Sequence, residues 1–127
     1  MSGGHFGYEQ YKIAYIADDI EQEIIKSGKP IPENKQDRWM KDHPEECVNF
    51  EWPEPVLRKM EEAIYALKRA QIYAQRVDYL LCSDDGIDSF HKRLEEELAE
   101  FDASAKKGDN GVMYIPIDRN KDPYEYD

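Results

Sequence analysis

The chain has 127 residues, 40% hydrophobic and 35% charged, and its 28 Asp and Glu against 17 Lys and Arg give a net charge of −11. This length suits one domain with a modest core, and the charge repels phosphate backbones, so no direct nucleic-acid binding is expected. The sequence has no run of about 18 apolar residues and no basic segment followed by an apolar one at its start. We therefore expect neither a membrane span nor a signal peptide, and we predict a cytoplasmic location.

The first regular pattern predicts an amphipathic helix over about residues 8–27. Apolar side chains recur every three or four positions on one face, and the opposite face is acidic. The apolar positions are Ile13, Ile16, Ala17, Ile20 and Ile24. Gly28 and Pro30 follow and predict the end of the helix.

Residues 28–53 show no sustained period and contain several prolines together with Trp39 and Trp52. Two interpretations are open for this stretch. One is a short helix near Asp37–Lys41. The other is an irregular connection that wraps the helices and is anchored by both indoles. We favour the second, since an exposed Trp is costly and an amphipathic ring makes a good anchor.

The strongest pattern predicts a long helix over about residues 55–82, opened by Pro55. Its heptad seam consists of Val56, Met60, Ala63, Leu67, Ala70, Ala74, Val77 and Leu81. Three of these residues are Ala, so another helix can approach closely. A second apolar stripe widens this face, at Leu57, Ile64, Tyr65, Ile72, Tyr73 and Leu80. So much apolar surface predicts a homo-oligomer formed through the seam.

A third helix is expected over about residues 86–105, with Asp85 as its N-cap and Asp88 in a capping arrangement. The short connection predicts an antiparallel αα-hairpin of the second and third helices. The predicted fold class is therefore all-α, a three-helix bundle built on this hairpin. Residues 1–105 would form the single domain. Residues 106–127 would form an extended or partly disordered tail, with at best an edge strand near 112–117.

A carboxylate cluster on the third helix suggests one enzymatic alternative. Carboxylates three residues apart share a helix face and can bind Mg²⁺, as in nucleotide pyrophosphohydrolases of the MazG type. The cluster consists of Glu95, Glu96, Glu97 and Glu100. That chemistry needs a second acidic pair, and Glu61, Glu62 and Asp78 lack the spacing. A solvated acidic face is preferred, with no cofactor or metal site, and Cys47 and Cys82 are expected to be reduced thiols.

Polar and aromatic side chains gather near the N-terminus, at the end of the long helix and at the start of the third. Tyr and Phe rings stack on bases, while Arg side chains and helix N-terminal N–H groups hold phosphate. A ligand site for a small nucleotide would use His5, Phe6, Tyr8, Tyr11, Arg76, Tyr79, Ser89 and Arg93. The alternative interpretation is that these tyrosines are ordinary edges of an amphipathic core.

Two blocks carry a family resemblance. Residues 2–13 read S-G-G-H-F-x-Y-x-Q-Y-x-I, and residues 73–94 read Y-A-Q-R-x-D-x-L-L-x-x-D-D-G-x-x-S-F-x-x-R-L. Both resemble a family of short phage- and prophage-encoded proteins, which usually has Asp where this chain has Gly7. The resemblance implies a phage setting, of the kind in which small proteins counter host defences, and by itself implies no activity.

Two functions fit that setting. The first is a non-enzymatic binding protein that sequesters a small nucleotide-like immune signal of the host. The second is an acidic inhibitor that binds a basic surface of a host protein. A MazG-like hydrolase is the weakest of the three alternatives.

Overall fold

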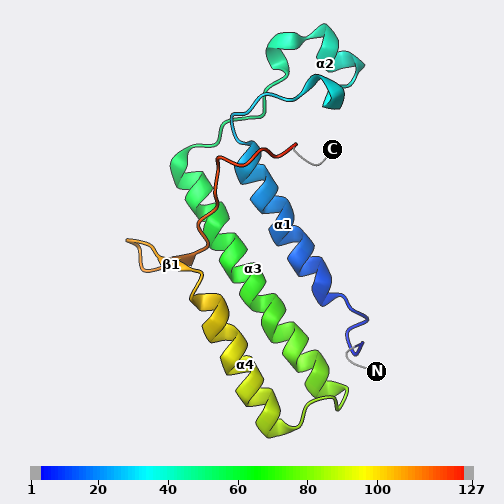
Figure 1. The fold of residues 1–127 in the computed structure, drawn as a ribbon, viewed down its shortest axis with the longest axis vertical. Coiled ribbons are helices and arrows are strands. Elements are labelled where there is room, and N and C mark those ends of the chain that lie inside the picture. Colours follow the sequence, from blue (N-terminus) through cyan, green and yellow to red (C-terminus); the bar gives the residue numbers. More distant parts are fainter. Residues whose placement is uncertain (1–3, 125–127) are drawn as a thin grey trace.

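The computed structural model describes residues 4–124 and consists mainly of helices, as the sequence predicted (Figure 1). The three long helices are α1 (Gln10–Lys26), α3 (Glu54–Leu81) and α4 (Ile87–Asp102). Both α1 and α4 pack against α3 and run in the opposite direction to it (Figure 1). Among the described residues, no helix is long and apolar enough to cross a membrane.

The hydrophobic core lies between α1 and α3, where Ile24, Leu57 and Ile64 are buried. Side chains from several segments surround this cluster, namely Ile20, Trp52, Met60, Ile115 and Ile117. Leu57 and Ile64 belong to the second apolar stripe of α3 and not to the heptad seam. None of the eight seam residues, all of which the structure describes, is buried. The seam is therefore not the core of the single chain, because α1 covers the neighbouring face of α3.

The α1 helix begins at Gln10, two residues later than expected. Gly7 and Tyr8 both have a φ of 62°, in the left-handed region, so the chain cannot enter a right-handed helix before them. The backbone of residues 4–8 therefore forms a tight loop ahead of the helix.

Residues 28–53 do not wrap the helices. They leave the end of α1, extend beyond the helices and return to α3, and an isolated bridge between Pro30 and Val48 joins the two arms (Figure 1). The excursion contains a short helix α2 (Arg38–Asp42) between two 3-10 turns, η1 (Glu33–Lys35) and η2 (Pro44–Glu46).

The expectation that both indoles act as anchors is wrong for one of them. Trp52 packs against the core, whereas Trp39 is 55% exposed and stacks on His43 with the ring centroids 4.2 Å apart. Asp37 starts α2 by accepting a 2.8 Å hydrogen bond from the backbone N–H of Met40. The short-helix interpretation of this stretch was therefore the better one.

After α4, the strands β1 (Lys106–Lys107) and β2 (Met113–Tyr114) form an antiparallel hairpin. The chain then runs back beside α3. The backbone N–H groups of Ile115 and Ile117 donate to the carbonyl and the side-chain carboxylate of Glu61, at 3.2 and 2.9 Å. Cys47 and Cys82, both within the described residues, form no disulfide.

Candidate functional site

The loop before α1 is held by one buried carboxylate. Asp78 of α3 is completely buried, and it accepts backbone hydrogen bonds from Gly4 at 2.9 Å, His5 at 2.6 Å and Phe6 at 3.2 Å. Successive N–H groups that converge on one anion form a nest, which requires an unusual backbone. Gly4 supplies it with a φ of 98°. The loop is thus folded around Asp78.

Gln10, the first residue of α1, completes the environment of this carboxylate. It is only 3% exposed, and its Nε2 donates to Asp78 at 3.2 Å and to the Oε1 of Gln75 at 2.9 Å. Burial by itself raises the pKa of Asp78, but the hydrogen bonds from Gly4, Phe6, His5 and Gln10 outweigh it and hold the pKa below its usual value. Asp78 is therefore a charged group in the interior.

Because the backbone of the loop faces inward, its side chains face solvent. Phe6 is 37% exposed, Tyr8 46% and Tyr11 40%, and His5 is exposed as well. The rings are ordered in pairs, with His5 edge-on to Phe6 at 5.1 Å and Tyr8 stacked on Tyr11 at 6.3 Å between centroids. We call these four residues the aromatic patch.

A second group of candidate residues forms an ion-pair cluster between α3 and α4. The side chain of Asp85 is 1% exposed, and its oxygens lie 3.3 Å from Arg76 Nη1 and 2.7 Å from Arg93 Nη1. Arg76 Nε also lies 2.6 Å from Glu97 Oε1, and its guanidinium lies 4.8 Å from the ring centroid of Tyr79. We call Arg76, Arg93, Asp85 and Glu97 the arginine cluster. Its two positive and two negative formal charges cancel.

The role of Asp85 differs from the expected one. The N-cap of α4 is Gly86, which makes no side-chain cap, and Asp85 points instead to the two arginines. A buried carboxylate is stabilised more by two guanidinium groups than by a single backbone N–H, so the ion pairs determine its position. The hydroxyl of Ser89 donates to the backbone carbonyl of Gly86, three residues earlier, at 3.4 Å.

The structure joins the two sequence blocks but does not gather all eight candidate residues. The first block is tied to the second through Asp78 and Gln75. Arg76, however, precedes Asp78 by two residues, which is about 200° around the helix. The aromatic patch and the arginine cluster therefore lie on opposite sides of α3. His5, Phe6, Tyr8 and Tyr11 form one group, and Arg76, Tyr79 and Arg93 form the other.

The sequence carried a signal for the buried carboxylate that pattern reading missed. Asp78 follows Ile64 by fourteen residues and Leu57 by twenty-one, which is a whole number of heptads in each case. It therefore lies on the same face of α3 as these two core residues. A carboxylate on the apolar face of a helix needs a partner. Its partner is a backbone segment far away in the chain, which no local pattern specifies.

The acidic residues of α4 are arranged as a solvent-facing surface. Glu95, Glu96 and Glu100 are exposed, while Glu97 turns to Arg76. Glu61 of α3, which the hydrolase alternative would need, is buried between the C-terminal segment and two arginines. Within residues 4–124, no group of three or more His, Cys, Asp or Glu side chains is placed to hold a metal ion.

The candidate residues thus come together at two places, the aromatic patch and the arginine cluster. Comparison of the chain with protein-family models, with curated proteins and with solved structures finds no match.

Proposed function

We propose that this protein is a non-enzymatic binding protein, and that it uses the aromatic patch to contact a basic surface of another protein. The observation that carries the proposal is the hydrogen-bonded loop around Asp78, which turns three ring side chains outward beside the exposed Tyr11 of α1. Aromatic residues are enriched at the energetic centres of protein interfaces, because they bury a large area at a low cost in side-chain entropy.

The rigidity of the loop supports this use. A flexible segment would lose conformational freedom on binding, and that loss weakens affinity. Here three backbone N–H groups are already fixed on one carboxylate, and two ring pairs are stacked or edge-on before any partner arrives. These contacts restrict the conformations of the patch before a partner binds.

The neighbouring surface of α1 extends the aromatic patch and adds negative charge beside it. Tyr15 and Asp18 follow Tyr11 at spacings of four and seven, which places them on the same exposed face of α1. Tyr15 is 68% exposed. Together with the net charge of −11, this arrangement favours a basic partner, both by complementarity and by steering its approach.

Sequestration of a nucleotide-like signal is the second candidate, and the arginine cluster is what favours it. Asp85 brings the guanidinium groups of Arg76 and Arg93 to one place, beside the ring of Tyr79. A phosphate would have to compete there with Asp85 and Glu97, two carboxylates that already neutralise the arginines. For that reason we rank this function below protein binding. The counter-defence setting implied by the resemblance suits both.

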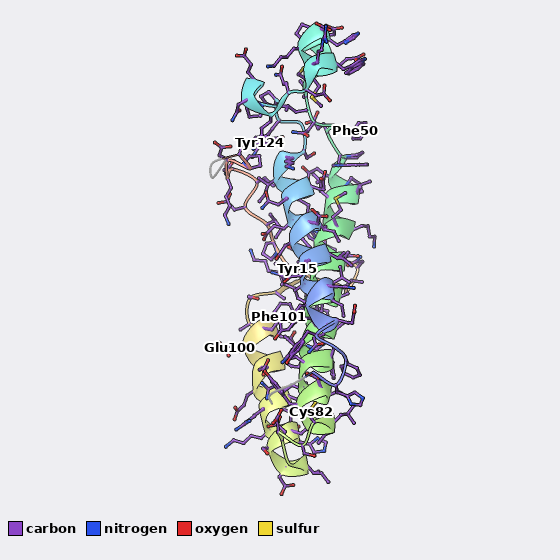
Figure 2. The ribbon with its side chains drawn as sticks, turned by 90° about the vertical axis from the view of Figure 1, so that its right-hand side faces the viewer. Tyr15, Phe50, Cys82, Glu100, Phe101 and Tyr124 are labelled. Carbon is purple, nitrogen blue, oxygen red and sulfur yellow. The ribbon has the colours of Figure 1, made fainter. Side chains whose placement is uncertain are left out.

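The test is a capture experiment with matched variants. Tagged wild-type protein, the double variant Phe6→Ala/Tyr8→Ala and the control Phe50→Ala are each mixed with bacterial lysate. Phe50 is also exposed, at 67%, and Figure 2 shows it far from Cys82 along the molecule. The patch lies near Cys82, because its loop is bound to Asp78 in the last turn of α3. We expect the wild type and the control to retain the same basic protein, and the double variant to lose it.

A thermal-shift screen with cyclic di- and trinucleotides and ADP-ribose derivatives runs alongside, since a tight ligand raises the melting temperature. Under the leading proposal none of them shifts it. A shift that Arg76→Ala removes, with no protein captured, would instead support sequestration.

A further inference from the structure

The rest of the chain covers the heptad seam of α3 only in part: none of its eight residues is buried, five are half-buried and three are exposed. On the neighbouring face, Leu57 and Ile64 are buried beneath α1. Along the seam itself, Val56 is 37% and Leu81 50% exposed, and Ala70 is exposed. A strip of apolar side chains along a whole helix is the kind of surface that another protein surface covers.

Two apolar grooves border this strip. One, of about 390 Å³, lies between α1 and α3 and is lined by Ile16, Ile20, Val56, Met60 and Ala63. The other, of about 470 Å³, lies between α3 and the β1–β2 hairpin and is lined by Tyr65, Ala66, Ala70, Tyr73 and Val112. Seam residues thus line part of both grooves, so the grooves belong to the seam surface.

The spacing of the seam is compatible with a second copy of this helix as the occupant. The intervals from Val56 to Leu81 are 4-3-4-3-4-3-4, which reads the same in both directions. We propose that α3 packs antiparallel against α3 of a second copy of this chain, in a two-fold symmetric dimer. Each seam residue then meets a seam residue of the other copy. The pairs are Val56 with Leu81, Met60 with Val77, Ala63 with Ala74, and Leu67 with Ala70.

Side-chain sizes favour this direction. In the antiparallel pair Leu67 meets Ala70, so a large side chain lies against a small one near the two-fold axis. A parallel pair in register would place Leu67 against Leu67 beside a layer of Ala70 against Ala70, so the separation of the helices would have to vary more along their length. Antiparallel α3 helices also oppose their dipoles.

The residues beside the seam fit in the same way. Tyr73 and Ala66 occupy equivalent heptad positions on the exposed flank of α3, and the antiparallel register places the Tyr73 of each copy opposite the Ala66 of the other. Tyr73 is 43% exposed, and Ala66 lines the second groove. Each tyrosine thus fills the groove of the opposite copy.

The size of the surface is sufficient. From Val56 to Leu81 the helix rises about 37 Å. The surface formed by α3 and by the adjoining halves of its neighbours, α1 and the β1–β2 hairpin, is about 20 Å wide. The resulting strip is about 700 Å² in projection, close to the roughly 800 Å² that each partner buries in a stable interface. The seam contains no charged residue, so the repulsion between two acidic chains acts mainly at a distance and is screened by physiological salt. This dimer does not depend on the function proposed above.

The first experiment measures mass in solution by analytical ultracentrifugation at about 0.15 M ionic strength. We expect the wild type to have twice the chain mass of 14.9 kDa at micromolar concentration. Ala70→Glu should halve the mass without changing helical content, because it places a charge beside the two-fold axis. Ala99→Glu, at an exposed alanine of α4, is the matched control and should remain a dimer. A wild-type mass of 14.9 kDa at tens of micromolar would overturn the proposal.

The second experiment tests direction. Val56→Cys and Leu81→Cys are made separately in a Cys47→Ser/Cys82→Ser background, mixed and oxidised. We expect a disulfide between the two different variants and none within either variant alone. Disulfides between two Val56→Cys chains or between two Leu81→Cys chains would overturn the antiparallel arrangement.

Discussion

The buried carboxylate of Asp78 accepts a 2.6 Å hydrogen bond from the backbone N–H of His5, which lies 73 residues earlier in the chain. This contact links the end of α3 to the loop before α1. It fixes the backbone that carries the aromatic patch, so the proposed binding surface depends on a buried carboxylate that no partner can reach.

Asp78→Asn should therefore destabilise the fold and loosen the loop. The substitution keeps the shape, but it removes the charge and replaces one acceptor oxygen by an amide that faces N–H donors. Hydrogen bonds to charged groups contribute about 1.5–3 kcal/mol each. We expect the free energy of unfolding to fall by at least the contribution of one such bond. Urea denaturation measures this. Asp19→Asn, at an exposed position in the middle of α1, is the control and should leave the midpoint unchanged.

The same carboxylate makes stability depend on pH in acid. Because the pKa of Asp78 in the folded protein lies below its ordinary value of 3.8, its charge stabilises the folded state above that pH, and this contribution is lost as the pH falls through the lowered pKa. Between about pH 5 and about pH 2.5, the free energy of unfolding measured in urea should fall more steeply with decreasing pH for the wild type than for Asp78→Asn. The difference in slope corresponds to the uptake of up to one proton on unfolding. Asp102, whose pKa is also lowered, is present in both proteins. Equal slopes would mean that Asp78 is not charged in the fold.

Gly7 offers a test of the loop conformation and of the family resemblance together. Its φ of 62° is left-handed, and a Cβ there would meet no atom within 4 Å. The cost of a substitution is therefore set by the backbone alone. Gly7→Val should lower stability by about 1–2 kcal/mol, and Gly7→Asp by less, because Asp tolerates this conformation. Thermal unfolding of both variants measures the difference. Equal losses would contradict the left-handed assignment.

The two arginines on Asp85 should differ in their effect on stability. The side chain of Arg76 is 14% exposed and also contacts Glu97 and Tyr79, whereas that of Arg93 is 58% exposed. Arg76→Ala should cost about 2–3 kcal/mol, since it leaves the buried carboxylate of Asp85 with fewer partners, and Arg93→Ala less than about 1 kcal/mol. Chemical unfolding distinguishes them. A larger loss for Arg93→Ala would show that the cluster is arranged differently.

Helical periodicity was sufficient to predict the three long helices, because each buries a face whose apolar residues recur every three or four positions. The observed bounds of α3, Glu54–Leu81, lie within a residue of the expected 55–82. Periodicity did not predict which face of α3 would form the core. The choice between the seam and the stripe of Leu57 and Ile64 depends on where α1 packs, and the sequence of α3 alone does not contain that information.

The candidate site was predictable in its residue types and not in its connections. The two blocks were recognised as polar and aromatic, and the structure links them through Asp78 and Gln75. Their division into an aromatic patch and an arginine cluster was missed, because Asp85 was assigned to a helix cap. Local rules favour Asp as an N-cap at that position, but ion pairs with arginines of two helices determine where its buried carboxylate lies.

The central claim is that the aromatic patch binds a basic protein partner, and the most direct test is calorimetric titration of the captured partner into purified variants. Tyr8→Ala and Tyr11→Ala should each weaken binding at least tenfold, about 1.4 kcal/mol, while Phe50→Ala stays close to the wild type. Higher ionic strength should weaken the wild-type complex, because its steering is electrostatic. Unchanged affinity in both tyrosine variants, or an equal loss in Phe50→Ala, would contradict the proposal.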